Sequence, residues 1–201
     1  MRHFPRAPKG LKVGLLGGSF DPAHSGHAHV AETALRRLGL DCVWWLVSPQ
    51  NPLKKASSPI ETRLRSARSV ATGSDMVVTD IESHLGTHYT IDTLKALKAR
   101  YRGVHFVWLM GGDNLAGFEH WRGWQEIARI VPICIVSRPS SGPRARLGRL
   151  AKQFPNARLP VHGAMRTPFA KPPVWVYLPA RWNGLSSTAL RARGAERDTL
   201  V

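Results

Sequence analysis

Cysteines, acidic side chains and long apolar runs are all scarce in this chain of 201 residues. The two cysteines, Cys42 and Cys134, lie in apolar runs, where a free thiol behaves as a small hydrophobic side chain. This usage indicates no disulfide framework and fits a reducing compartment, so we expect a cytoplasmic protein. No apolar run reaches the length of a membrane span and no signal-peptide core follows Met1, so we expect no membrane partner.

Acidic residues are outnumbered, because 13 Asp and Glu stand against 29 Lys and Arg and give a formal net charge of +16. Such an excess suits nucleic acid, and it also suits an enzyme whose substrates carry phosphates, since a positive field attracts them. The chain shows no zinc-finger spacing, no aromatic RNA-binding motif and no evident helix-turn-helix. We therefore expect phosphate-bearing small molecules as partners, with a nucleic-acid-binding protein as the alternative. These features do not determine the oligomeric state.

Two common phosphate-binding motifs, the GxxxxGK[ST] loop and the GxGxxG fingerprint, are also absent. In their place residues 13–29 read VGLLGGSFDPAHSGHAH. The apolar start predicts a buried strand that ends at Gly17 and Gly18, where the backbone can approach a ligand, and a helix should cover residues 24–38. A glycine turn that leads into a helix N-terminus forms an anion site, because N–H groups and the positive end of the helix dipole point at the turn.

His24 and His27 stand three residues apart in this stretch, so we expect them on one face of the helix beside its N-terminus. Two imidazoles there can donate hydrogen bonds to phosphate oxygens and stabilise developing charge. Two alternatives remain, which are a solvated helix start with incidental histidines and a metal site formed by His24, His27 and His29. We expect no metal bound by the protein itself, since no carboxylate or cysteine stands at a recognised ligand spacing.

Apolar runs alternate with helical patterns along the rest of the chain. We predict strands over residues 41–49, 75–81, 104–110, 131–136 and 174–178. Helices are predicted over 59–72, capped by Ser58, and over 91–101, capped by Thr90. A further helix over 115–130 should be broken at Gly117 and Gly123, and one short helix is expected within 144–153 among mobile loops. This alternation predicts an α/β single domain, residues 12–201, with a mainly parallel sheet of five or six strands and helices on both faces. Residues 1–11 are interpreted as a basic, flexible arm.

Polar residues follow several of these strands. Lys54 comes after the second strand and Asp113 after the fourth, and the carboxyl ends of parallel strands are where open α/β sheets bind ligands. Residues 186–188, followed by Arg191, would form a second anion site at a helix start. Simpler interpretations remain, because Lys54 also suits a solvated loop, and Thr90 and Asp113 also suit helix caps.

The motifs together resemble a known superfamily. GGSFDPAHSGH is similar to the signature of the HxGH nucleotidyltransferases, and LSSTALR is similar to their second signature, ISSTxxR. SPQNPLKK, THYTIDTL, GGDNLAGFEHW and VSRP resemble segments of the bacterial nicotinate-nucleotide adenylyltransferase family, so the resemblance covers residues 12–193. It implies a Rossmann-like fold and the transfer of AMP from ATP to nicotinate mononucleotide, which gives deamido-NAD and pyrophosphate in NAD biosynthesis. Phosphopantetheine adenylyltransferases, which share the first motif, are the rival within the superfamily.

The resemblance also implies roles for single residues. Gly17, Gly18, Ser19, Phe20, Ser186, Ser187, Thr188 and Arg191 would bind ATP, while His24, His27 and Arg191 would act in catalysis, and Lys54, Thr90, Asp113 and Trp121 would line the mononucleotide side. Mg²⁺ would be the cofactor, held mainly by the ATP phosphates and water, which suits a chain without a carboxylate cluster. All of these sets are expected to face one cleft at the carboxyl ends of the strands.

Overall fold

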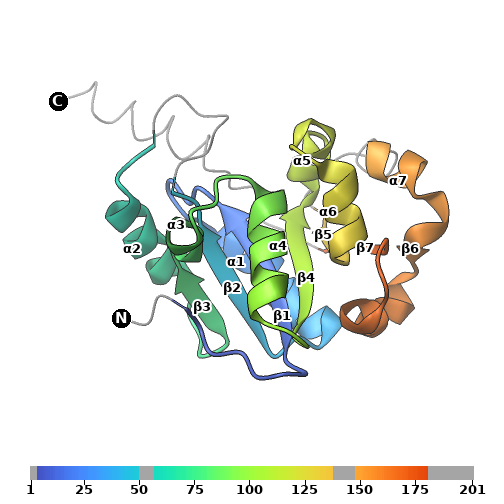
Figure 1. The fold of residues 1–201 in the computed structure, drawn as a ribbon, viewed down its shortest axis with the longest axis horizontal. Coiled ribbons are helices and arrows are strands. Elements are labelled where there is room, and N and C mark those ends of the chain that lie inside the picture. The colour runs from blue at the N-terminus through green and yellow to red at the C-terminus, as the bar shows by residue number, and fades with distance from the viewer. Residues whose placement is uncertain (1–3, 50–56, 138–147, 181–201) are drawn as a thin grey trace.

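The computed structural model describes residues 4–49, 57–137 and 148–180, and it is organised around one parallel sheet (Figure 1). The sheet has seven strands in the order β3-β2-β1-β4-β5-β7-β6, and every neighbouring pair is parallel. The strands are β1 (Lys12–Gly18), β2 (Cys42–Val47), β3 (Met76–Thr79), β4 (His105–Gly111), β5 (Ile133–Val136), β6 (Arg158–Leu159) and β7 (Trp175–Leu178). The predicted α/β class and parallel sheet are confirmed, and β6 is the strand that the sequence did not predict.

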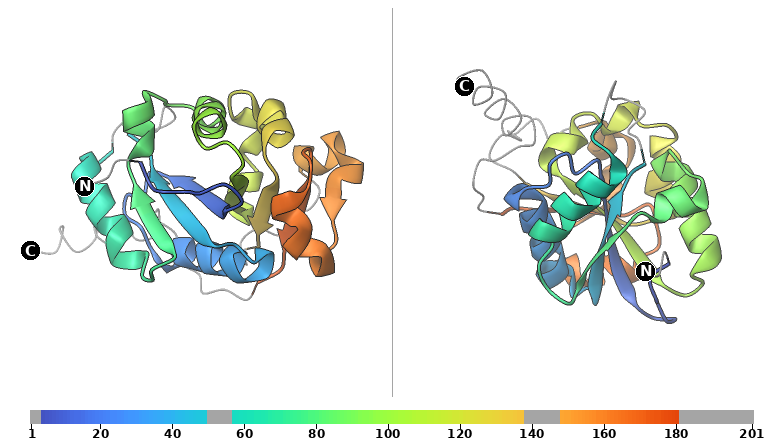
Figure 2. Two further views of the ribbon diagram at one scale, coloured as in Figure 1. Left: turned by 60° about the horizontal axis from the view of Figure 1, so that its bottom comes forward. Right: turned by 90° about the vertical axis from the view of Figure 1, so that its left-hand side faces the viewer.

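Helices cover both faces of the sheet (Figure 2). They are α1 (Ser25–Leu38), α2 (Ile60–Val70), α3 (Ile81–Leu85), α4 (Thr90–Arg100), α5 (Gly112–Leu115), α6 (Trp124–Ile130) and α7 (Arg149–Gln153), with 3₁₀ helices η1 (Phe118–His120), η4 (Pro155–Ala157) and η5 (Val161–Phe169). One buried cluster joins the sheet to α1, α2 and η5, and a second joins its other face to α3, α4, α6 and α7. The core therefore consists of two apolar layers separated by the sheet.

Adjacent tryptophans on β2 show how the strands serve both layers. Trp44 and Trp45 are both fully buried, yet Trp44 belongs to the cluster under α4 and Trp45 to the cluster under α1. Successive side chains of a strand point to opposite faces, so a strand covered on both sides can be apolar throughout. Among the described residues no helix is long and apolar enough to cross a membrane.

Several predicted helix boundaries were wrong. Ser58 and Thr90 are not helix caps, because Pro59 and Tyr89 occupy those positions and Thr90 is the first residue of α4. No helix was predicted between the strand at 75–81 and the helix at 91–101, but this segment contains most of α3. The broken helix over residues 115–130 is confirmed, since α5, η1 and α6 are separate and Gly123 takes a left-handed backbone (φ 66°) before α6.

The stretch expected to be mobile loops with one short helix is more regular than predicted. α7 lies in the expected place, and it is followed by η4, β6 and η5. Ala164, Thr167 and Pro168 of η5 are buried, and Ala164 belongs to the core cluster that includes α1 and α2. Pro168 lies inside η5, and a proline inside a segment argues against a helix, which explains why the sequence did not indicate η5.

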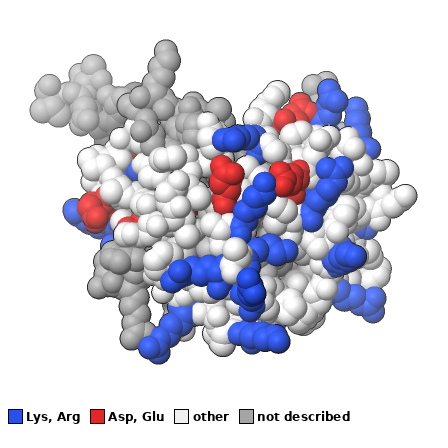
Figure 3. Space-filling model, viewed as in Figure 1, with Lys and Arg blue, Asp and Glu red and all other residues white. Residues whose placement is uncertain are grey.

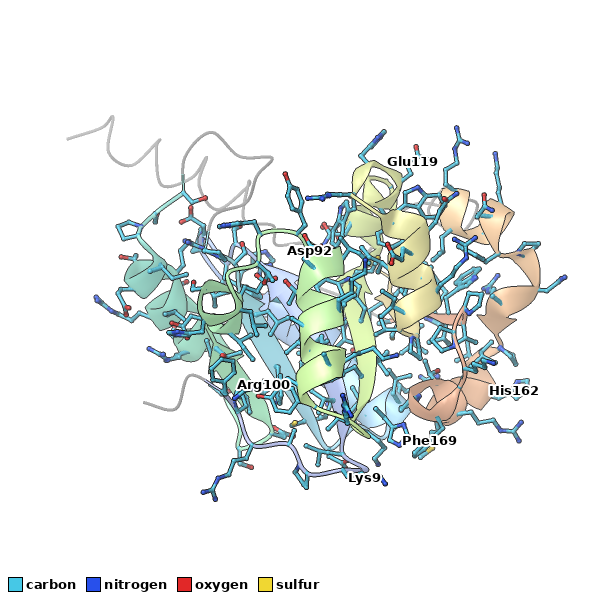
Figure 4. All side chains as sticks on the ribbon, viewed as in Figure 1. Lys9, Asp92, Arg100, Glu119, His162 and Phe169 are labelled. Atoms are coloured by element: carbon cyan, nitrogen blue, oxygen red, sulfur yellow. The ribbon has the colours of Figure 1, made fainter. Side chains whose placement is uncertain are left out.

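Residues near the N-terminus lie along the side of the sheet opposite the carboxyl ends of the strands. The Tyr101 hydroxyl donates to the Pro5 carbonyl over 3.0 Å, and the Arg100 guanidinium lies 3.8 Å from the centre of the Phe4 ring. Figure 4 shows Arg100 and Lys9 at this end of the molecule, and Asp92 at the other end of α4. The carboxyl ends of the strands thus lie at the end of the sheet where α4 begins.

Candidate functional site

The turn after β1 is shaped by aromatic rings packed against its glycines. β1 runs through Gly17 and ends at Gly18, as predicted. A Cβ atom on Gly17 would lie 2.5 Å from Cη2 of Trp108, and one on Gly18 would lie 3.2 Å from Cζ of Phe20. Because Trp108 is buried and rigid, Gly17 has no room for a side chain. The space freed by these glycines is filled by the protein's own rings.

Phe20 packs against the turn from the core side. Its backbone is in the left-handed region (φ 48°), which is uncommon for a residue with a side chain. Its ring is 1% exposed and lies edge-on to His27, with the centroids 5.0 Å apart, and 5.2 Å from the Trp45 ring. The side chain of Phe20 therefore positions the turn and His27 from the core.

The two histidines cap α1 reciprocally. His24 is the N-cap residue with an extended backbone, so it stands just before the helix, but it lies with His27 beside the helix N-terminus as predicted. Nδ1 of His24 accepts a hydrogen bond from the Gly26 N–H over 3.0 Å, and Nδ1 of His27 accepts one from the His24 N–H over 3.2 Å. The two rings lie 4.0 Å apart, centroid to centroid. The structure thus brings the imidazoles together through a capping box.

This cap fixes the tautomer of both imidazoles. A nitrogen that accepts a backbone N–H bond carries no hydrogen, so Nδ1 is the bare nitrogen and Nε2 carries the hydrogen in each neutral ring. α1 has no acidic residue in its first turn, so the positive end of its dipole is not neutralised there. The arrangement offers two neutral N–H donors at a helix N-terminus, which suits a phosphate. Within the described part of the chain no three His, Cys, Asp or Glu side chains are placed to hold a metal ion.

Arg63 holds the backbone around this turn, and the sequence did not predict that role. It is 2% exposed, and its guanidinium donates to four carbonyls, those of Ser19 (3.1 Å), Ser48 (2.5 Å), Pro49 (2.7 Å) and Ser58 (2.7 Å). Burial lowers the pKa of the guanidinium from its usual value, with the Asp21 carboxylate acting in the opposite direction. Its position one turn before buried Ala67, on the apolar stripe of α2, was the available signal.

Thr90 and Trp121, both predicted on the mononucleotide side, belong to segments that touch. The guanidinium of Arg122 lies 4.6 Å from the centre of the Tyr89 ring, and a Cβ atom on Gly123 would lie 3.3 Å from Cγ1 of Ile91. The loop that carries Trp121 therefore packs over the first turn of α4. Asp113 is exposed in α5, directly after the carboxyl end of β4.

Trp108 links the two halves of the site. Its ring lies beneath Gly17 on one side and 6.1 Å from the Trp121 ring on the other. The histidine turn and the Thr90–Trp121 region thus lie at the same end of the sheet, joined by one buried indole. Lys54, Ser186, Ser187, Thr188 and Arg191 lie outside the described residues, so their part in the predicted cleft stays a prediction.

Lys and Arg side chains are spread over the face that carries α4 and α6, with few Asp or Glu among them (Figure 3). Some of these cations are paired, as in the contact between Lys95 and Glu126 at 2.8 Å. The cationic excess in the sequence therefore appears as a positive surface, which attracts anionic substrates over a distance of about a Debye length.

Comparison with known proteins agrees with the motifs. A family model described as cytidylyltransferase-like matches residues 15–193. A protein of Caulobacter sp. (strain K31) named probable nicotinate-nucleotide adenylyltransferase is 54% identical over 185 residues, which are 91% of this chain and 98% of that protein. A protein of the same name from Cereibacter sphaeroides (strain ATCC 17025 / ATH 2.4.3) is 52% identical over 188 residues, 93% of this chain and 100% of that protein.

Solved structures share the fold. Nicotinic acid mononucleotide adenylyltransferase of Plasmodium falciparum, complexed with NaAD, superimposes with a TM-score of 0.68 at 16% identity, over 90% of this chain and 83% of that one. A putative nicotinate-nucleotide adenylyltransferase of Vibrio parahaemolyticus gives a TM-score of 0.55 at 15% identity, over 92% and 88% of the two chains. The chain therefore belongs to the cytidylyltransferase-like family, among its nicotinate-nucleotide adenylyltransferases.

Proposed function

We propose that this protein transfers the adenylyl group of ATP to nicotinate mononucleotide and releases pyrophosphate, with deamido-NAD as the second product. The observation that carries the proposal is the pair of imidazoles capped through Nδ1 at the N-terminus of α1, with Nε2 left as the hydrogen-bearing atom. Relatives at 54% and 52% identity bear the name of this activity. The Plasmodium falciparum structures, complexed with NaAD and with APC, support the two substrate classes.

The reaction needs no protein nucleophile. A phosphate oxygen of the mononucleotide attacks the α-phosphorus of ATP in line, and the bond from that phosphorus to the bridging oxygen of pyrophosphate breaks. His24 and His27 would donate Nε2–H hydrogen bonds to the phosphate oxygens as charge builds up on them. Because the attacking phosphate already carries negative charge, neither imidazole has to accept a proton.

The remaining assignments follow the family resemblance. The backbone of Gly17, Gly18, Ser19 and Phe20 would face ATP, with Ser186, Ser187, Thr188 and Arg191 on its phosphates, and Lys54, Thr90, Asp113 and Trp121 would line the mononucleotide side. Mg²⁺ would bind chiefly to phosphate oxygens and water and neutralise part of their charge. The described donor set fits this mode, since a magnesium ion held by phosphates requires no cage of protein carboxylates.

The acceptor site should prefer the acid to the amide. The first N–H groups of an α-helix have no partner within the helix, so the start of α4 at Thr90 offers donors. The ring carboxylate of nicotinate mononucleotide accepts such bonds with both oxygens, whereas the amide of nicotinamide mononucleotide would turn an NH₂ donor toward a donor. Buried groups left unpaired cost about 1–3 kcal/mol each, so we expect kcat/KM for the acid to exceed that for the amide at least about a hundredfold.

A pyrophosphate-release assay with ATP and three acceptors tests both statements. We expect turnover with nicotinate mononucleotide, turnover reduced by about two orders of magnitude with nicotinamide mononucleotide, and none with phosphopantetheine. Equal efficiencies with the acid and the amide would contradict the donor-only pocket. Turnover with phosphopantetheine alone would contradict the proposed acceptor.

A further inference from the structure

Glu82 is a buried carboxyl group with no part in the roles assigned above. It is the second residue of α3, directly past the carboxyl end of β3, and it is 6% exposed. Its Oε1 accepts a hydrogen bond of 2.8 Å from the hydroxyl of Thr93, which is fully buried in α4. Burial raises the pKa of Glu82 to about 7, and the Thr93 hydrogen bond works against that rise. Burial of a carboxyl group costs free energy unless its hydrogen bonds compensate.

The contacts of Glu82 hold the segment that leads into α4. The Thr87 N–H donates to the Glu82 carbonyl over 3.0 Å, and the hydroxyls of Thr87 and Thr93 lie 2.9 Å apart. The segment from residue 87 to residue 93 is therefore tied to α3 at both of its ends. Tyr89 and Thr90 lie between these two anchors.

The Thr93 hydroxyl has a single hydrogen and a choice of acceptors. Its oxygen lies 2.8 Å from Oε1 of Glu82 and 3.3 Å from the Tyr89 carbonyl oxygen. That carbonyl already accepts the N–H groups of Asp92 (3.0 Å) and Thr93 (3.1 Å). The shorter bond to Glu82 thus leaves the Tyr89 carbonyl to the backbone of α4. Without the carboxyl group the Thr93 hydroxyl would turn to the Tyr89 carbonyl or the Thr87 hydroxyl, and the direct side-chain bond between α4 and α3 would be lost.

We propose that Glu82 is a positioning residue, which acts through Thr93 to hold residues 87–90 in the geometry that the acceptor mononucleotide requires. The inference rests on the proposed function, because it takes Thr90 as part of the acceptor side. The histidine turn is held by a different set of contacts, those of Arg63 and Phe20, and none of them involves α3. Loss of the Glu82 contact should therefore raise the KM for nicotinate mononucleotide and leave the KM for ATP unchanged.

The test compares Glu82→Leu, Glu82→Gln and Thr93→Val with the wild-type enzyme in the pyrophosphate-release assay, with each substrate varied in turn. Gln keeps an acceptor oxygen for the Thr93 hydroxyl, Leu keeps the volume without an acceptor, and Val removes only the hydroxyl. Glu126→Leu is the matched control, since Glu126 is an exposed carboxylate that pairs with Lys95 on the surface. Thermal unfolding of each variant shows that it is folded.

We expect Glu82→Leu and Thr93→Val to raise the KM for nicotinate mononucleotide about tenfold, the equivalent of one buried hydrogen bond of roughly 1.4 kcal/mol, with the KM for ATP within about twofold of the wild type. Glu82→Gln should leave the KM for nicotinate mononucleotide at the wild-type value. A merely structural role would lower kcat through loss of active protein and leave both KM values alone, and that result would overturn the proposal.

Four further outcomes are also decisive. Equal rises in both KM values would overturn the proposal, because they would show no selectivity for the acceptor. If Glu82→Leu does not fold, Thr93→Val decides, since it deletes the same hydrogen bond without introducing an apolar side chain beside a helix end. A wild-type enzyme that turns over another acceptor but not nicotinate mononucleotide would refute the proposed function and this inference together, whereas an active wild type with unaffected variants refutes the inference alone.

Discussion

Replacing Arg63 with methionine should loosen the backbone on which the site is built. Methionine nearly matches the length of the arginine stem and can fill much of its buried volume, so the main loss is the guanidinium and its four hydrogen bonds. Those bonds fasten the turn after β1, the end of β2 and the segment before α2 to one side chain. The Asp21 carboxylate, which accepts the Ser58 N–H over 3.0 Å, would still tie the first of these to the last.

The magnitude follows from the number and burial of these bonds. A hydrogen bond to a charged group contributes about 1.5–3 kcal/mol, so four would suggest roughly 6–12 kcal/mol. The residues whose carbonyls accept these bonds are only half-buried, so water can replace part of what is lost. The removal of one partner from a buried charged network costs about 3–5 kcal/mol, and we expect Arg63→Met to fall in that range.

Urea unfolding of the variant, followed by circular dichroism, measures this loss directly. Arg65→Met is the control, because Arg65 lies on the exposed side of the same helix and its loss should change stability by less than about 0.5 kcal/mol. The KM for ATP should rise in Arg63→Met alone, since the Ser19 carbonyl belongs to the turn assigned to the nucleotide. An Arg63→Met protein that unfolds at the wild-type urea concentration would refute the reasoning.

Three other changes have defined outcomes. Gly17→Ala should lower the free energy of unfolding by about 1–3 kcal/mol, measured by differential scanning calorimetry, because its methyl group would meet the Trp108 ring. Gly117→Ala is the control and should not be destabilised, since no atom lies within 4 Å of its Cβ position. Equal effects would contradict the packing argument. His27→Ala should lower kcat on the order of 10²–10³ with a smaller change in the KM for ATP, and an unchanged kcat would reduce His27 to a structural role. Burial raises the pKa of Glu82 from 4.5 to about 7 in the fold, so the protonated carboxyl group stabilises the protein at low pH, and this contribution is lost as the pH rises through 7. Urea titrations should show that the wild type loses about 2–3 kcal/mol of unfolding free energy relative to Glu82→Gln between pH 5 and pH 8. Parallel pH profiles of the two proteins would contradict the shift.

The sequence predicted the central strands because each carries a continuous apolar run. β2 and β4 were placed correctly to within two residues, since strands buried on both faces have no polar side chains inside them. β6 has only two residues, Arg158 and Leu159, and η5 contains Pro168, which argues against a helix, so neither yields a pattern that a sequence window can distinguish from a loop.

The site was predictable where chemistry is local, and hidden where it depends on long-range packing. The glycines and histidines of the β1–α1 turn are contiguous, and their placement together is confirmed for the described residues. Arg63 contacts Ser19, 44 residues earlier in the chain, and Glu82 contacts Thr93 across two helices. Nothing in the sequence near either residue indicates its partner. A buried charge on an apolar stripe signals that a partner exists, but only the fold identifies it.

The capping geometry gives a physical reason for histidine at these two positions. A short capping side chain such as Asn could also accept the Gly26 N–H, but its NH₂ donors stay close to the cap and do not reach as far as Nε2 of an imidazole. Lysine could contact a phosphate, but it has no acceptor for a backbone N–H. An imidazole does both, because its two nitrogens lie on different sides of a rigid ring. In the proposed function the site would therefore contact phosphates through N–H donors that the cap orients at the helix N-terminus.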